Sequence, residues 1–222
     1  MLFSPWRIEL AIREDDLEFF REFYESGEWF RLGPEGVTAL LYLAAEFSAR
    51  SICLFLLENG ADVNASYNGF TALCGAAAGG DADVVGDLLR YGAKIDGNPD
   101  TVCPPLLTAI QHGRTGAALH LLEAGADVDR CQLWSGESAL DLARRFRRTT
   151  EEAALLERGA RSTYELPPCS GEEERALLAY LLGKTKRMLL EQKEFLTIGG
   201  PASLRSTMVP GKQKKLLFTW GV

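Results

Sequence analysis

The feature that most constrains this chain is a Gly-Ala pair that recurs along it at nearly constant spacing. The pairs begin at positions 60, 92, 125 and 159 of 222 residues, so the successive steps are 32, 33 and 34 residues. Two adjacent leucines precede each pair: Leu56-Leu57, Leu88-Leu89, Leu121-Leu122 and Leu155-Leu156. A degenerate copy stands one step earlier, at Gly27 with Phe23-Tyr24. Such periodicity is typical of arrays whose units pack only on their neighbours.

A second landmark opens each unit 21 or 22 residues before its glycine. It reads Thr38-Ala39-Leu40, Thr71-Ala72-Leu73, Pro104-Pro105-Leu106 and Ser138-Ala139-Leu140. Each landmark starts an alanine-rich helix, and the paired leucines lie on a second one. Alanine lets the two helices of a hairpin approach closely, while the leucines supply contact area. After the glycines, alternation such as Asp62-Val63-Asn64 predicts the extended arm of a β-hairpin finger.

These residues resemble the ankyrin repeat, whose length is near 33 residues and whose signature is T-P-L-H-x-A. The resemblance covers about residues 5–161, and the fullest match runs from Gly69 to Ala93. It implies an all-α solenoid of stacked helix-turn-helix units with fingers. We therefore predict an ankyrin-repeat domain over residues 1–161, with about five repeats of which the first and last are caps. A helical extension over 162–198 and a basic tail over 199–222, whose order is left open, would follow.

The chain departs from the family pattern in three ways. The place of the signature histidine is held in turn by Leu41, Cys74, Leu107 and Asp141. One extra residue between Thr38 and Gly60 predicts that the helices of the first full repeat are shifted or bulged. The third finger has Val102 where a turn glycine would stand, which leaves its shape open.

Both ends of the array carry polar residues that are expected of caps. Ser4-Pro5 predicts a helix start at which the serine hydroxyl accepts an unpaired amide. Asp15-Asp16 replaces the inter-helix glycine in the first copy. Glu152 stands where other copies are apolar, so the last repeat is expected to face water in part. The predicted outer polar face of the first copy consists of Glu9, Arg13, Glu18 and Glu22.

Charge is segregated along the chain, whose net charge is −7. From residue 184 onward there are eight Lys or Arg and two Glu, which gives +6 and leaves −13 for residues 1–183. An apolar stripe after the capping box Ser170–Glu173 would cover the open side of the last repeat or bind a dimer or partner helix. The tail from Lys212 to Trp220 would fold back on the acidic array, touch anionic surfaces, or act as a peptide ligand, for which Trp220-Gly221-Val222 resembles a C-terminal motif.

No motif for catalysis, cofactor binding or metal binding is present in the sequence. His112 and His120 fall in two different helices, and the five cysteines are odd in number and lack C-x-x-C spacing. We therefore expect no cofactor, no metal and no enzyme activity, although Cys103 and Cys131 near the fingers leave a thiol-dependent enzyme as an alternative. The longest apolar stretch, residues 37–45, is too short to span a membrane, and the charged N-terminus argues against secretion. We expect a cytoplasmic protein, with the nucleus as another location.

The family resemblance implies a non-catalytic scaffold or adaptor that binds another protein on a concave face of fingers and first helices. The partner-binding residues carried over are Tyr67, Asn68, Phe70, Asp100, Gln111, His112, Trp134, Glu137, Arg145 and Phe146, with Glu46, Phe47, Ala78, Gly79, Cys103 and Ser135 beside them. The alternative for the aromatic residues is packing between fingers. A specific nucleic-acid partner is not expected of an acidic chain, and a monomer is favoured. The alternative function is a regulatory module whose tail binds anionic membrane or nucleic acid.

Two further hypotheses concern single segments. The run Arg144, Arg145, Arg147 and Arg148 would either form a solvated cap face, paired with Glu151, Glu152 and Glu157, or anchor an acidic peptide. The segment 56–65 resembles the finger stretch that is hydroxylated on asparagine in some family members. Asn64 would be the modified residue, and the alternative is a plain turn asparagine.

Overall fold

A computed structural model describes residues 4–165, which form a series of helical hairpins. The chain divides into two compact units, residues 1–180 and 181–222, and all described residues belong to the first. The predicted apolar stripe, the basic tail and most of the predicted helical extension lie outside the described residues. The helices are α1 (Pro5–Arg13), α2 (Leu17–Glu25), the 3-10 helix η1 (Glu28–Leu32), α3 (Gly33–Glu46), α4 (Arg50–Glu58), α5 (Ala72–Gly79), α6 (Ala82–Arg90), α7 (Pro105–His112), α8 (Thr115–Glu123), α9 (Ala139–Arg145) and α10 (Thr149–Glu157).

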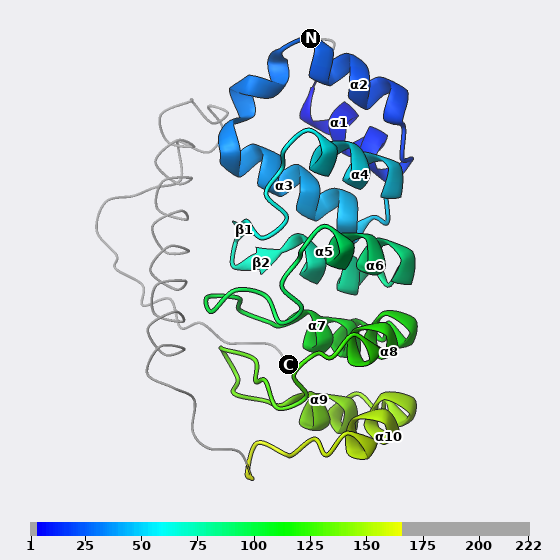
Figure 1. Cartoon of the computed structure of the whole chain (residues 1–222), viewed down its shortest axis with the longest axis vertical. Helices are drawn as coiled ribbons and strands as arrows, with labels where there is room; N and C mark the ends of the chain where they lie inside the picture. Colours follow the sequence, from blue (N-terminus) through cyan, green and yellow to red (C-terminus); the bar gives the residue numbers. More distant parts are fainter. Residues whose placement is uncertain (1–3, 166–222) are drawn as a thin grey trace, which may run out of the picture. The chain divides into compact units, whose positions relative to one another are not determined.

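The hairpins stack in sequence order (Figure 1). The pair α1–α2 forms an N-terminal hairpin, and α3–α4, α5–α6, α7–α8 and α9–α10 form repeats 1 to 4. First helices pack on first helices, α3 on α5 and α5 on α7, while second helices pack on second helices, α4 on α6 and α6 on α8. The loops before repeats 2, 3 and 4, which we call fingers 2, 3 and 4, project to one side (Figure 1). The predicted all-α repeat solenoid is confirmed.

Each hairpin turns through one residue in the left-handed region. These residues are Asp15, Ser48, Gly80, Gly113 and Arg147, with φ of 51°, 59°, 93°, 67° and 56°. When the repeats are aligned on these turn residues, the extra residue of repeat 1 falls in α3, which is uninterrupted and 14 residues long. Of the two predicted alternatives, a shift or a bulge, the structure shows the shift: α3 is continuous and its register is displaced by one residue. Tyr42, and not Leu41 as we predicted, therefore holds the place of the signature histidine.

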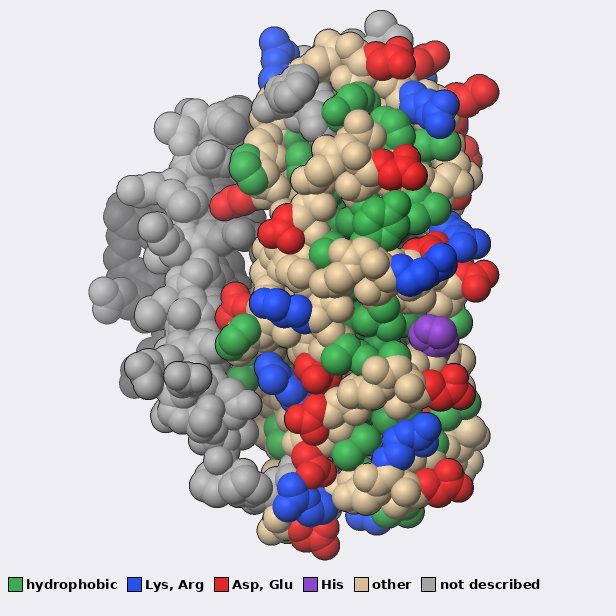
Figure 2. Space-filling model, in the orientation of Figure 1, with side chains coloured by type: hydrophobic (Ala, Val, Ile, Leu, Met, Phe, Trp, Pro, Cys, Tyr) green, Lys and Arg blue, Asp and Glu red, His purple; other side chains and the backbone are tan. Residues whose placement is uncertain are grey.

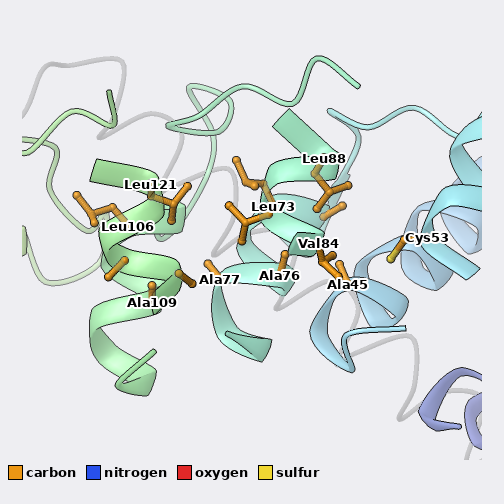
Figure 3. Close-up of a cluster of buried hydrophobic side chains, with 14 of the residues drawn as sticks. Ala45, Cys53, Leu73, Ala76, Ala77, Val84, Leu88, Leu106, Ala109 and Leu121 are labelled. Atoms are coloured by element: carbon orange, nitrogen blue, oxygen red, sulfur yellow. The ribbon is translucent and has the colours of Figure 1, made fainter. Parts of the chain in front are cut away.

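The core follows the paired leucines. The first leucine of every pair is fully buried, at 0% exposure for Leu56, Leu88, Leu121 and Leu155. Each contributes roughly 1.5–3 kcal/mol to folding. Alanines of successive first helices lie against one another, with Ala45 near Ala76 and Ala77 near Ala109 (Figure 3). Small residues here allow the close stacking that the sequence predicted.

The N-terminal hairpin is joined to repeat 1 by Asp15. Its carboxylate accepts hydrogen bonds from the backbone amides of Ser51 and Ile52, both at 3.1 Å, and so caps α4 from the neighbouring unit. The predicted role of the Ser4 side chain is wrong. Ser4 does precede α1, but its hydroxyl is buried without a hydrogen-bond partner in the described part of the chain, and its backbone carbonyl makes the helix-start bonds instead.

Candidate partner-binding face

Finger 2 is a two-stranded hairpin whose sequence dictates its turn. Strands β1 (Ser66–Tyr67) and β2 (Phe70–Thr71) pair antiparallel, with Ser66 opposite Thr71 and Tyr67 opposite Phe70. Asn68 and Gly69 both have positive φ, 54° and 79°, as a type I′ turn requires. Asn-Gly is the preferred pair for this turn because both residues tolerate the left-handed region. The hairpin places Asn68 at an exposed tip.

The three fingers are joined into one row by their backbones. The amide of Val102 in finger 3 donates to the Gly69 carbonyl at 2.9 Å, and the amide of Leu133 in finger 4 donates to the Val102 carbonyl at 3.0 Å. Val102, which stands where a turn glycine was expected, is fully buried. Finger 4 closes through a bridge between Cys131 and Ser138. The three fingers therefore differ in local structure, and packing and backbone hydrogen bonds hold them in one row.

A ladder of side chains fixes the spacing of the finger bases. The carbonyl or carboxylate oxygens of Asn64, Asp96 and Asp129 accept from the backbone amides of Lys94, Asp127 and Arg161, at 2.8, 2.9 and 3.0 Å. Burial raises the pKa of Asp96 above its ordinary value. The Asn64 amide nitrogen also donates to the Gly92 carbonyl at 3.0 Å, so both polar atoms of this side chain are bonded. Hydroxylation of Asn64 stays a prediction.

The aromatic residues of finger 2 pack on a helix. The rings of Tyr67 and Phe70 lie 5.9 and 6.4 Å from the ring of Tyr42 in α3, measured between centroids. Burial, with the nearby charge of Glu46, raises the pKa of Tyr42 to about 12. Tyr42 is the main residue of this face that our sequence reasoning missed. The one-residue insertion hid it, and aligning the first helices from their C-terminal ends would have found it.

Finger 4 and α9 bring three predicted residues together. The Arg145 guanidinium pairs with the Glu137 carboxylate at 3.1 Å and lies over the Phe146 ring, 4.8 Å from its centroid. Trp134, three residues before Glu137, is 50% exposed, and Ser135 beside it is exposed as well. This end of the face therefore combines an exposed indole with a charged pair, which is a common composition for protein interfaces.

The remaining predicted residues divide by exposure. Asp100 and His112 are exposed, and Gln111 is half-buried. Ala78 and Cys103 are buried, so the structure contradicts their assignment to the face. A side chain at Gly79 would bring its Cβ to 2.5 Å from the Glu46 carbonyl oxygen, because the first helices stack closely there. Residues at the tips of fingers are thus available to a partner, while residues between successive first helices are not.

The buried thiols are poor nucleophiles. Burial raises the pKa of Cys103 to about 12 and that of Cys74 to about 11, so neither is a thiolate near neutral pH. Cys131 is half-buried, with its sulfur 3.6 Å from the Asp129 carbonyl. The thiol-enzyme alternative therefore loses Cys103 as its nucleophile. Within residues 4–165, no three His, Cys, Asp or Glu side chains are placed to hold a metal ion.

A shallow groove of about 480 Å³ lies next to the start of α3. It is lined on one side by Gly33, Pro34, Val37 and Thr38 and on the other by residues 59–62 and Ala65. It occurs where the chain enters repeat 1 through η1 rather than through a finger. None of the helices described is long and apolar enough to cross a membrane.

Comparison with known families agrees with this architecture. The family model for ankyrin repeats, in three copies, matches residues 8–99, from α1 to finger 3. No curated protein matches the chain. Repeats 3 and 4 continue the same stack of hairpins with the same leucine and glycine positions. The match shows ankyrin repeats over residues 8–99, and repeats 3 and 4 continue the same helical stack beyond it.

Proposed function

We propose that this chain is a non-catalytic scaffold that binds a partner protein on its finger face, defined as fingers 2 to 4 with the adjoining first helices. Ankyrin repeats generally mediate protein–protein interaction, and the family is typically non-enzymatic. A cytoplasmic monomer that requires no cofactor is the form in which we expect it to act.

The observation that carries the proposal is the exposure of Trp134. Half of this large side chain faces solvent, although the core of repeat 4 is closed by smaller residues such as Leu140 and Leu142. Tryptophan is among the residues that most often anchor a protein interface. The backbone bond from Leu133 to finger 3 holds this segment in place, so a partner would lose little entropy in ordering it.

The surroundings of Trp134 fit the rim of such an interface. The Glu137–Arg145 pair joins the same finger to α9, while Asp100 and Asn68 expose polar groups on fingers 3 and 2. Polar residues around an aromatic anchor set orientation and specificity rather than most of the affinity. Tyr67 and Phe70 belong to the scaffold of the face, since both pack on Tyr42.

The test compares Trp134→Ala with Tyr91→Ala. Tyr91 is a matched control because it is also an exposed aromatic, at 44%, but it is the C-cap residue of α6, a second helix. Proteins captured from a cell extract by wild type and by each variant would be quantified by isotope-coded mass spectrometry. We expect the amount of each specific partner captured to fall about tenfold or more with Trp134→Ala and to stay the same with Tyr91→Ala.

Circular dichroism and urea unfolding of both variants should match wild type, because neither side chain is in the core. Equal capture of every protein by wild type and Trp134→Ala would show that this part of the finger face is not the binding surface. Equal losses in both variants would show that the loss is not specific to the fingers.

A further inference from the structure

The start of each second helix forms an edge of the array that we call the turn edge. In the N-terminal half, carboxylates satisfy the free amides there. Asp16 accepts from the Phe19 amide at 3.0 Å, and Asp81 accepts from the amides of Asp83 and Val84 at 2.9 and 3.4 Å. Asp15 serves α4 in the same way. This is the expected chemistry, because a helix N-terminus carries partial positive charge.

The C-terminal half reverses that chemistry. Arg114 and Arg148 stand at the N-cap positions of α8 and α10, and neither arginine side chain caps its own helix. Arg147 occupies the left-handed turn position, with φ of 56°, where repeats 2 and 3 have glycine. A bulky side chain at positive φ is unfavourable for folding. The Arg114 guanidinium, by contrast, donates to the Ala78 carbonyl in the last turn of α5, where a cation is favourable.

The neighbouring carboxylates do not compensate these three arginines. Arg144 pairs with Glu152 at 3.0 Å, which is one of the pairs that the solvated-face hypothesis expected, whereas Arg145 pairs with Glu137 of finger 4 at 3.1 Å. Arg114, Arg147 and Arg148 have no ion pair with any described residue. Glu151, at the start of α10, is 2% exposed and accepts a hydrogen bond from the Thr115 hydroxyl at 2.8 Å.

Packing brings the arginines of adjacent repeats together. The Arg148 guanidinium lies over Gly113, so close that a Cβ on this glycine would be 2.6 Å from the guanidinium carbon. Arg114 follows Gly113 in the chain. The aliphatic part of its side chain lies over Gly80, and its Nε donates to the Ala78 carbonyl at 2.8 Å. The Arg148 Nε is buried without an acceptor among the described residues. These contacts hold the side chains of Arg114 and Arg148 in place, and Arg147 precedes Arg148 in the chain.

Charge along the array also changes between its two halves. Residues 4–90 contain 15 Asp or Glu and six Lys or Arg. Residues 105–165 contain nine Asp or Glu and eight Lys or Arg. On the face shown in Figure 2, acidic side chains predominate at the end formed by α1 and α2, and both signs occur at the opposite end. An anionic partner would therefore be repelled from the N-terminal half and tolerated near repeats 3 and 4.

We propose that Arg114, Arg147 and Arg148 form an anchor for a carboxylate-rich segment of a partner protein. Guanidinium groups bind carboxylates through paired, charge-assisted hydrogen bonds, and the partner's negative charge would offset the positive ends of α8 and α10. The anchor lies at the turns that follow the first helices, away from the finger tips, and does not depend on Trp134. Together, the two surfaces would let one partner contact both the fingers and the turn edge of repeats 3 and 4.

The test uses the full chain and a fluorescein-labelled peptide of six glutamates, followed by fluorescence anisotropy. The variant is Arg114→Gln/Arg147→Gln, since both side chains are exposed, and the control is Arg21→Gln/Arg31→Gln, two exposed arginines of the N-terminal half. We expect the first variant to weaken binding about tenfold or more and the control to change it less than about twofold. Binding should weaken as salt rises from low to physiological concentration.

A third variant separates the contribution of the C-terminal lysines. Lys212→Gln/Lys214→Gln/Lys215→Gln should retain the arginine-dependent binding, and Trp134→Ala should retain it as well. The proposal is overturned if wild type does not bind the peptide saturably, if the control loses as much affinity as the Arg114 and Arg147 variant, or if only the lysine variant loses binding. Urea midpoints of all variants would identify any loss that is due to unfolding.

Discussion

At the scale of single residues, the turn positions show how side chains decide where glycine is needed. All five hairpins use a left-handed residue, but only Gly80 and Gly113 are glycines. At both, an arginine of the next repeat occupies the space where a Cβ would lie. Asp15 keeps its side chain because the carboxylate caps the neighbouring helix. Backbone conformation and the neighbouring repeat therefore select these residues together.

Gly113→Ala and Gly116→Ala test this argument within one repeat. Gly113 has φ of 67° and contacts Arg148, so alanine there should lower the free energy of unfolding by about 1–2 kcal/mol or more. Gly116 lies in helix α8 with no atom within 4 Å of its Cβ position, so alanine should raise stability by about 0.5–1 kcal/mol. Urea unfolding would measure both changes. Equal effects at the two positions would contradict this account of the turn.

At the scale of elements, finger 4 and α9 are tied to the segment that follows repeat 4. The Asp141 carboxylate accepts from the Ser138 hydroxyl at 2.9 Å and from the Thr163 amide at 2.7 Å, and the Thr163 hydroxyl also donates to it. The Ser138 amide donates to the Thr163 hydroxyl at 3.0 Å. Sequence alone identified Asp141 only as a replacement for the signature histidine, because nothing in the local pattern indicates a partner 22 residues away.

These bonds predict a pH dependence of stability. Burial by itself would raise the pKa of Asp141, but the hydrogen bonds from Thr163 and Ser138 outweigh it and hold the pKa below its ordinary value. Because the folded-state pKa is the lower one, this stabilisation is present above the unfolded-state pKa, about 4, and is lost as the pH falls through the folded-state value.

Urea midpoints of wild type and Asp141→Asn, measured between about pH 6 and pH 3, would test this linkage. Wild type should be the more stable protein at the higher pH, and the difference should shrink as the pH falls. A difference that stays constant over this range would show that ionisation of Asp141 does not contribute.

At the scale of the described array, neighbouring repeats decide how well each unit is covered. The second leucine of the pair is 8% exposed in repeat 1 and 3% exposed in repeat 3, but 49% exposed in repeat 4. The same residue in the same local pattern thus has a different environment at the end of the stack. Glu152, which replaces an apolar residue, agrees with the prediction that the last repeat faces water in part.

Leu122→Ala and Leu156→Ala should therefore differ in cost. Leu122 is buried between repeats, so its truncation should destabilise the protein by about 2–5 kcal/mol. Leu156 keeps half of its surface exposed, and its truncation should cost less than about 1 kcal/mol. Chemical denaturation of the two variants gives both values directly. If Leu156→Ala costs as much as Leu122→Ala, repeat 4 is not a partly solvated end.

The sequence by itself determined the repeat, because period, leucine pairs and turn residues act within one unit or between adjacent units. It also placed Trp134, Glu137 and Arg145 on one finger and helix. Only the tertiary structure showed that Tyr67 and Phe70 rest on Tyr42, that Ala78 and Cys103 are buried, and that Arg148 lies over Gly113. These contacts join residues about 25 to 35 positions apart, and their geometry depends on how closely the helices stack, which a local pattern does not encode.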